Sequence, residues 1–286
     1  MKIGIVYPQT ESKGSPEAVR RIGLATEELG FDHLLAYDHV VGAVHADREP
    51  KLWGPYTEND PFHDPFVMFA YLAGMTQRIE FASGVLILPQ RQTVLVAKQA
   101  ADLDLLSGGR QRLGVGVGWN YVEYDALGED FRTRGARADE QIGLMRQLWT
   151  GEVLSYEGRF DRMDRGRLIP GPARQIPIWI GGFGDAAFRR GARLGDGFMF
   201  AGRLDACLEG WKDVQRRLGE EGRSVAGYGA DLLTTSSKSV DDVLHAIDAW
   251  SAAGGTHLSV VCTGMGLDST EAHLDFIHQI AQRRPQ

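Results

Sequence analysis

The chain contains little cysteine, no long apolar run and no excess of positive charge. Its 286 residues include two cysteines, which cannot build a disulfide framework, and no Cys/His spacing indicates a zinc site. No apolar run approaches the roughly 20 residues that a transmembrane helix needs, and the first residues form a strand pattern rather than a signal peptide. A formal net charge of −7 argues against a general nucleic-acid binder. We therefore expect a cytoplasmic protein that acts on a small molecule and binds no metal, membrane or nucleic acid.

Apolar segments of strand length alternate with helical patterns along the chain. With 43% hydrophobic and 24% charged residues, the composition suits a globular protein with a large core. The apolar pattern predicts eight strands, at residues 3–7, 33–37, 79–86, 113–117, 176–180, 198–200, 230–235 and 257–261. Helices are predicted between them. Pro16 stands at the first position of one helix, another starts at Asp64-Pro65, and Ser239 and Ser269 cap two more.

The predicted strands are short and nearly all apolar, which indicates burial on both faces in a parallel sheet. An open, doubly wound sheet is an alternative, but eight strand–helix units in about 280 residues fit a closed barrel better. We therefore predict an α/β fold, a single-domain (β/α)8 TIM barrel over residues 1–286.

Three insertions interrupt the predicted alternation. They follow strand 2 (40–63), follow strand 4 (119–134) and precede strand 5 (151–175). The first contains Trp53, Tyr56 and Phe62, and loops of this length are usually functional or disordered. We expect it to form a pocket wall on the C-terminal face, where the active sites of such barrels lie.

A glycine turn follows the fifth predicted strand. Gly181 to Gly184 separate this strand from a helix rich in Ala and Arg. Unpaired amides and the dipole at such a helix start favour a phosphate group. An ordinary tight turn would carry the same glycines, so the turn alone leaves both interpretations open.

The predicted strand ends offer few acid–base groups. A Schiff-base aldolase needs a lysine inside the mouth, and the nearest one, Lys238, lies beyond its strand. A metal-dependent hydrolase needs converging histidines and carboxylates, and the chain has no His-X-His. A glycosidase needs two carboxylates, whereas Asp38 alone clearly ends a strand. The remaining glycines, aromatic residues and amides suit a large planar cofactor that supplies the chemistry itself.

Several motifs occur together and in one order. They are DH at 38–39, SGVLILPQR at 83–91, GGRQRLGVGVGW at 108–119, DFRTRGAR at 130–137, YEGRF at 156–160, PIWIGG at 177–182 and ARLGDGF at 192–198. With this set the chain resembles the luciferase-like monooxygenase superfamily, closely from residue 2 to about residue 201. The DHV and DFRTRGAR segments resemble the branch that uses coenzyme F420, a deazaflavin. The monooxygenases that use flavin mononucleotide (FMN) form the sister branch.

The resemblance implies a cofactor ring laid across the strand ends. The family commonly carries a non-prolyl cis peptide behind this ring, which would fall at residues 83–85, although an ordinary glycine bulge is the alternative there. The cofactor phosphate would lie on the amides of residues 181–184. The residues expected to bind the cofactor are therefore Ser83, Gly84, Val85, Trp119, Asn120, Gly181, Gly182, Phe183 and Gly184.

His39, supported by Asp38, is the candidate catalytic residue. The resemblance places it beside the reactive edge of the ring, where it could stabilise a reduced anion or donate a proton. A hydrogen-bonded strand-end histidine without a catalytic role is the alternative. Some deazaflavin dehydrogenases carry a glutamate acid where Trp119 and Asn120 stand here, and Glu123 lies one helical turn further on. The catalytic acid is therefore left open.

The resemblance favours an oxidoreductase that transfers a hydride between F420 and a small organic substrate. A two-component monooxygenase using reduced FMN and oxygen is one alternative, and a non-catalytic carrier of a flavin or deazaflavin is another. The resemblance also implies a homodimer, together with a reductase or an F420-reducing dehydrogenase that supplies the reduced cofactor.

Overall fold

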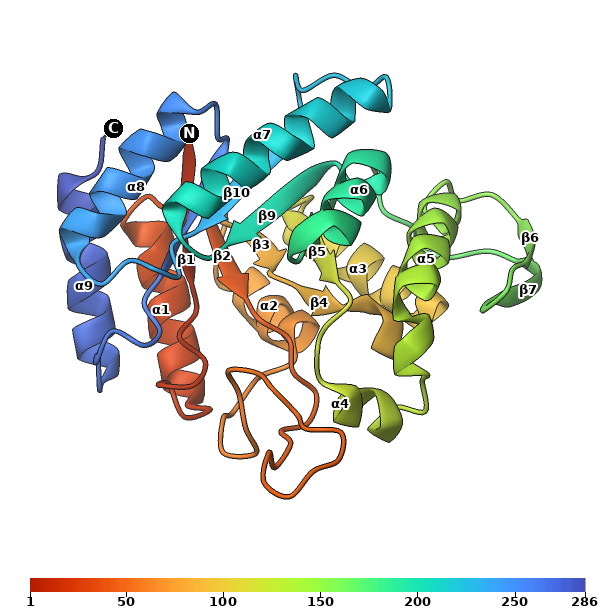
Figure 1. Cartoon of the computed structure of the whole chain (residues 1–286), viewed down its shortest axis with the longest axis horizontal. Coiled ribbons are helices and arrows are strands. Elements are labelled where there is room, and N and C mark those ends of the chain that lie inside the picture. The colour runs from red at the N-terminus through yellow and green to blue at the C-terminus, as the bar shows by residue number, and fades with distance from the viewer. Residues whose placement is uncertain (286) are drawn as a thin grey trace.

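Eight parallel strands form a closed barrel at the centre of the protein (Figure 1). The computed structural model describes residues 1–285. The barrel strands, in order around the ring, are β1 (Lys2–Val6), β2 (His33–Ala36), β3 (Glu80–Ser83), β5 (Gln111–Gly116), β8 (Ile178–Gly181), β9 (Gly197–Ala201), β10 (Gly229–Leu233) and β11 (His257–Val261). The ring closes because β11 pairs with β1 and β3 pairs with β5. The predicted α/β barrel is confirmed.

Helices surround the barrel and cover its outer surface (Figure 1). They are α1 (Pro16–Glu28), α2 (Pro65–Ala73), α3 (Thr93–Ser107), α5 (Arg134–Leu148), α6 (Gly184–Leu194), α7 (Leu204–Glu220), α8 (Val240–Ala252) and α9 (Thr270–Arg283). The predicted capping residues Ser239 and Ser269 each accept a hydrogen bond from an amide in the first turn of α8 or α9. Ser15 and Asp64 do the same at the predicted starts of α1 and α2. These helix starts are therefore confirmed.

Two hydrophobic clusters hold the layers together. A small cluster inside the barrel packs around Trp179 and Met199. A much larger one lies between the strands and the helices and includes Trp211 and Trp250, both buried. Because the strands contribute to both clusters, nearly all of their residues are buried and apolar.

The third predicted strand is divided into two. The sequence predicts one strand at residues 79–86, whereas β3 ends at Ser83 and β4 (Leu86–Ile87) begins after a cis peptide bond between Gly84 and Val85. A Cβ atom on Gly84 would lie 2.5 Å from the Leu35 side chain, so only glycine fits there. The expected non-prolyl cis peptide is present at the expected place.

The three insertions differ in structure. Residues 40–63 form a loop without regular elements, and it extends from the barrel end to which β2 leads (Figure 1). Residues 119–134 contain the short helix α4 (Tyr121–Ala126), which the sequence analysis did not predict. Residues 151–175 contain an exposed hairpin of β6 (Leu154–Glu157) and β7 (Arg162–Gly166) at the side of the molecule. Within residues 1–285, no helix is both long enough and apolar enough to cross a membrane.

Candidate active site

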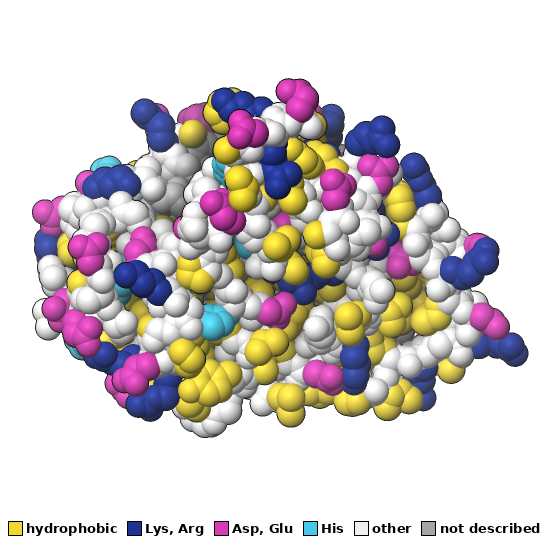
Figure 2. Space-filling model, turned by 90° about the horizontal axis from the view of Figure 1, so that it is seen from below, with side chains coloured by type: hydrophobic (Ala, Val, Ile, Leu, Met, Phe, Trp, Pro, Cys, Tyr) yellow, Lys and Arg dark blue, Asp and Glu magenta, His cyan; other side chains and the backbone are white. Residues whose placement is uncertain are grey.

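A cavity of about 580 Å³ lies at the C-terminal ends of the barrel strands. This volume is within the range of small-molecule sites in proteins. Figure 2 views the molecule from below Figure 1, the side on which the 40–63 loop lies, and hydrophobic side chains are exposed across that face. Of the predicted site residues, the cavity is lined by Asp38, His39, Gly84, Val85, Trp119, Gly181, Gly182 and Phe183.

Val85 forms the floor of the cavity between two glycines. A Cβ atom on Gly116 would lie 2.5 Å from Val85 Cγ2, and one on Gly181 would lie 2.5 Å from Val85 Cγ1. Both distances are too short for real atoms, so the two strand ends can hold the Val85 side chain only because they carry glycine. The result is a floor without projecting side chains beside Val85, which suits a flat group.

His39 is held in the cavity wall by a buried carboxylate. Its Nδ1 lies 3.1 Å from Glu123 Oε1, and the Glu123 side chain is 1% exposed. Glu123 also accepts hydrogen bonds from the Val40 amide at 2.9 Å and from Gln90 Nε2 at 3.2 Å. An ionised carboxylate can only accept, so Nδ1 carries a proton and Nε2, across the ring, is left to act on a ligand.

The electrostatic surroundings keep Glu123 charged. Burial raises the pKa of a carboxyl group, but hydrogen bonds from His39 and Gln90 and the Val41 amide outweigh it, so the pKa of Glu123 lies below its ordinary value. Glu123 thus fixes both the tautomer and the orientation of His39, as buried carboxylates do for catalytic histidines.

Because the pKa of Glu123 is lowered in the folded protein, Glu123 should make the free energy of unfolding depend on pH in the acidic range. Its contribution is complete above the ordinary carboxyl pKa of 4.5 and is lost as the pH falls through the lower value of the folded state. We expect the urea concentration at the midpoint of unfolding to decrease as the pH is lowered through this range. The decrease should be smaller in Glu123→Gln. Equal acid dependence of the two proteins would contradict this role.

The 40–63 loop closes an aromatic wall around His39. The His39 ring lies 4.8 Å from the Phe62 ring, 5.0 Å from that of Tyr56 and 5.6 Å from that of Trp119, measured between ring centroids. Gly54 allows the loop to approach Trp119, since a Cβ atom there would lie 2.2 Å from the indole. Burial raises the pKa of Tyr56 to about 12, so its hydroxyl stays protonated. The expected pocket wall is confirmed.

The glycine turn leads from the cavity to the start of α6. Gly182 and Phe183 line the cavity, and Phe183 precedes the helix without any side-chain cap on its first amides. Arg134 and Arg190 also line the cavity near this helix. The uncapped amides at this helix start suit a phosphate, as do the guanidinium groups of Arg134 and of Arg190, which is also paired with Asp139.

Comparison with known proteins agrees with this geometry. A family model described as luciferase-like monooxygenase matches residues 1–275. The chain belongs to the luciferase-like monooxygenase family. It is 32% identical to an F420-dependent glucose-6-phosphate dehydrogenase of Nakamurella multipartita over 229 residues, which cover 75% of this chain and 63% of that protein.

Two solved structures each superpose on 99% of the chain. The monooxygenase RslO1 from Streptomyces bottropensis has a TM-score of 0.81 at 19% identity, covering 99% of this chain and 98% of that one. An F420-dependent secondary alcohol dehydrogenase, in complex with an F420-acetone adduct, has a TM-score of 0.78 at 16% identity and covers 99% of both chains. At these identities the likeness establishes the shared fold.

The sequence predicts that Asp38 supports His39, and in the structure Asp38 lines the cavity while its carboxylate bonds within the protein. In this luciferase-like chain its carboxylate accepts hydrogen bonds from the Ile87 amide at 3.0 Å and from Arg91 Nη2 at 2.7 Å. Burial raises the pKa of Asp38, although Arg91 opposes this. Its interactions tie β2 to β4, and Asp38 thereby positions the residue that follows it, His39.

Asp38→Asn should therefore destabilise the protein. Removing one charge from a buried ion pair leaves Arg91 incompletely paired, and we expect a loss of about 3 kcal/mol in the free energy of unfolding. Urea denaturation measures this loss. The control is Asp102→Asn, in an exposed pair with Lys98, which should change stability by less than about 0.5 kcal/mol. Equal effects of both variants would contradict the assignment.

Three of the residues expected to bind the cofactor do not line the cavity. Ser83 is buried and donates a hydrogen bond to the Gly114 carbonyl, and Asn120 caps α4 by accepting one from the Val122 amide. Gly184 lies at the first position of α6, beyond the lining. The Ser83 hydroxyl and Asn120 Oδ1 therefore form hydrogen bonds within the protein itself.

Sequence reasoning left Glu123 without a partner. The signal was the spacing of Asn120 and Glu123, since an N-cap residue followed three positions later by Glu indicates a helix start. A helix beginning at residue 121 returns Glu123 to the strand ends, where it meets His39. Gln90, inside the SGVLILPQR motif, gave no such signal.

Proposed function

We propose that the protein is an oxidoreductase that transfers a hydride between F420 and a small organic substrate. The observation that carries this proposal is His39, oriented by buried Glu123 in the wall of a flat-floored cavity. The relative from Nakamurella multipartita, named as F420-dependent, supports F420 as the cofactor.

The cavity fits a deazaflavin in two respects. The floor around Val85 would support the flat ring, with Gly116 and Gly181 below it. The amides of Gly182 and Phe183, with the start of α6, would hold the phosphate. Gly84 and Trp119 complete the group of lining residues that we assign to cofactor binding.

When bound, the deazaflavin exchanges a hydride with the substrate, and the protein has to position the substrate and move a proton. During substrate oxidation, the substrate would lose a hydride to the cofactor and a proton to His39 Nε2. Glu123 would stabilise the resulting imidazolium. In the reverse direction His39 would return that proton. The aromatic wall of Tyr56, Phe62 and Trp119 would exclude water from this exchange.

Turnover with a panel of small alcohols and carbonyl compounds tests the proposal. We expect at least one substrate to change the visible absorbance of F420 or its reduced form at a rate that depends on the enzyme. Tight F420 binding with no turnover of any compound would instead support a non-catalytic carrier.

A second candidate is a two-component monooxygenase that uses reduced FMN and oxygen. The structural likeness to a monooxygenase, at a TM-score of 0.81, favours it. Oxygen consumption coupled to a flavin reductase would decide for this candidate, since a deazaflavin reacts poorly with oxygen. In either case a separate reductase or F420-reducing dehydrogenase would supply the reduced cofactor.

We also propose that the protein forms a homodimer through α2 and α3. These neighbouring helices expose Val67, Tyr71 and Leu95, which are 69%, 47% and 51% exposed. Apolar side chains exposed on two neighbouring helices suit an interface with a second copy of the chain. We expect Leu95→Glu to shift the sedimentation coefficient from dimer to monomer, whereas Val153→Glu, at an exposed apolar residue elsewhere, should not. A wild-type monomer would contradict the proposal.

A further inference from the structure

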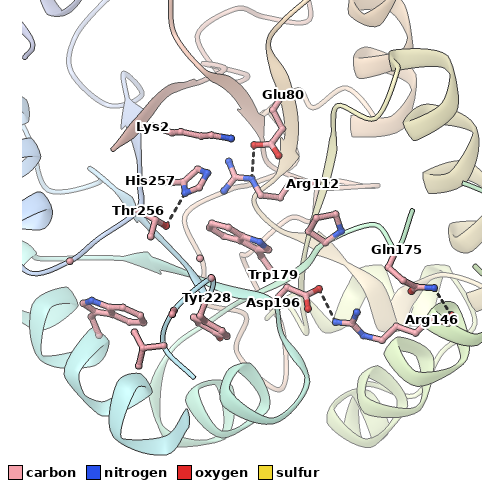
Figure 3. A pocket seen from close by; sticks show the side chains of 17 residues that line it. Lys2, Glu80, Arg112, Arg146, Gln175, Trp179, Asp196, Tyr228, Thr256 and His257 are labelled. Atoms are coloured by element: carbon pink, nitrogen blue, oxygen red, sulfur yellow. Dashed lines mark hydrogen bonds and ion pairs between the residues drawn. The ribbon is translucent and has the colours of Figure 1, made fainter. Parts of the chain in front are cut away.

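A second cavity lies at the opposite end of the barrel. Its volume is about 610 Å³, and it shares no lining residue with the candidate active site (Figure 3). The strands begin at this end, so the lining includes Lys2 of β1, Glu80 of β3, Arg112 of β5 and His257 of β11. The catalytic proposal uses none of these residues.

Arg112 brings a buried, incompletely bonded guanidinium to this cavity. It is 1% exposed and stacks on Trp179, with its central carbon 4.3 Å from the ring centroid. Nη1 donates to Asp231 at 3.0 Å, and Nε lies 3.2 Å from Glu80 Oε2. Nη2 is buried and has no hydrogen-bond partner among the described residues. A buried N–H donor of this kind calls for an acceptor.

Lys2 adds a second cation beside Arg112. Figure 3 shows the ends of both side chains close to His257. Within residues 1–285, Lys2 has no ion pair or side-chain hydrogen bond. Burial, Arg112 and Lys2 together lower the pKa of His257 to about 2, so the imidazole is neutral and leaves the positive charge on its neighbours.

The carboxylates at this end restrict the charge of a ligand. Asp231 and Glu80 both face Arg112, and Asp231 also accepts a hydrogen bond from Ser259. Asp196 is already paired with Arg146 at 2.9 Å. A dianion such as phosphate would meet Glu80 and Asp231 at close range, so a single negative charge suits the site better.

The other side of the cavity is largely apolar. Trp211 and Tyr228 stack nearly in parallel, with an interplanar angle of 13°, and Pro177 and Val225 lie in the same lining. A ligand that extends from Arg112 into this part therefore needs an apolar body.

We propose that this cavity binds a small organic monocarboxylate. Its carboxylate would accept hydrogen bonds from Arg112 Nη2 and Lys2 Nζ, and its apolar body would lie against Pro177 and Tyr228. This site is independent of the proposed hydride transfer at the other end of the barrel.

Calorimetric titration with benzoate tests the proposal on the full chain. We expect one saturable site per chain, with binding about fivefold weaker in Lys2→Gln because one exposed charge–charge contact is lost. The matched control is Lys238→Gln, an exposed lysine on the loop before α8, which should bind benzoate like the wild type. Inorganic phosphate should bind more weakly than benzoate to all three proteins.

Arg112→Gln should abolish benzoate binding, and thermal unfolding establishes whether this variant is folded. If Arg112→Gln is not folded, the benzoate affinity of Lys2→Gln tests the proposal. That variant should fold, because Lys2 is exposed and its side chain has no partner among the described residues. F420 affinity should be unchanged in Lys2→Gln, which separates this site from the active site. No saturable benzoate binding, or equal affinity in wild type and Lys2→Gln, would overturn the proposal.

Discussion

Replacing His39 with alanine is expected to lower kcat by about a hundredfold, while F420 affinity changes little. Loss of a positioned proton-transfer group typically costs about 10²–10⁴ in rate. The floor at Val85 and the start of α6, which we assign to cofactor binding, would remain in this variant. Steady-state kinetics and an F420 titration of the same preparation measure the two quantities. The control is His278→Ala, at an exposed histidine of α9, which should behave as the wild type.

Glu123→Gln separates a role in positioning from a merely structural one. The amide can hold the His39 ring but cannot stabilise its charged form, so we expect a smaller loss of kcat, about tenfold, and a displaced pH profile. If Glu123 had only a structural role, Glu123→Gln would lower the free energy of unfolding without displacing the pH profile of kcat. Full activity in both His39→Ala and Glu123→Gln would leave the histidine as an ordinary strand-end residue.

Gly181→Ala should weaken F420 binding strongly. The new methyl group would meet Val85 Cγ1 at 2.5 Å, and Val85 cannot move the other way because its Cγ2 already faces Gly116. The valine must therefore shift into the cavity, where the ring would lie. Overpacking of this kind costs about 1–3 kcal/mol, or about tenfold to a hundredfold in affinity.

The control for this variant is Gly143→Ala, at a position in α5 where a Cβ atom meets nothing within 4 Å. It should raise stability slightly, because alanine favours a helix over glycine by about 1 kcal/mol, and it should leave F420 binding unchanged. Equal F420 affinity in Gly181→Ala and wild type would show that the ring does not lie on this floor.

The barrel could be predicted from the sequence because its determinants are local. Eight apolar segments, their spacing and capping residues such as Ser239 are all visible along the chain. The strand ends could also be predicted to meet, since parallel strands of a barrel share one mouth. That rule predicts that His39, Val85 and Gly181 lie at the same end of the barrel, although they are far apart in the sequence.

The contacts of individual side chains could not be predicted in this way. The partners of Asp38, which are the Ile87 amide and Arg91, lie beyond the break in the third strand, and periodicity does not reveal that break. Ser83 and Asn120 have the right positions but donate or accept within the protein. Glu123 reaches His39 only because a short helix forms inside an insertion.

Parallel titration of the purified protein with F420 and with FMN, followed by fluorescence quenching, tests the central claim most directly. The account predicts saturable F420 binding at one site per chain, with FMN bound at least tenfold more weakly. Tight FMN binding by a protein that leaves F420 and its reduced form unbound would contradict it.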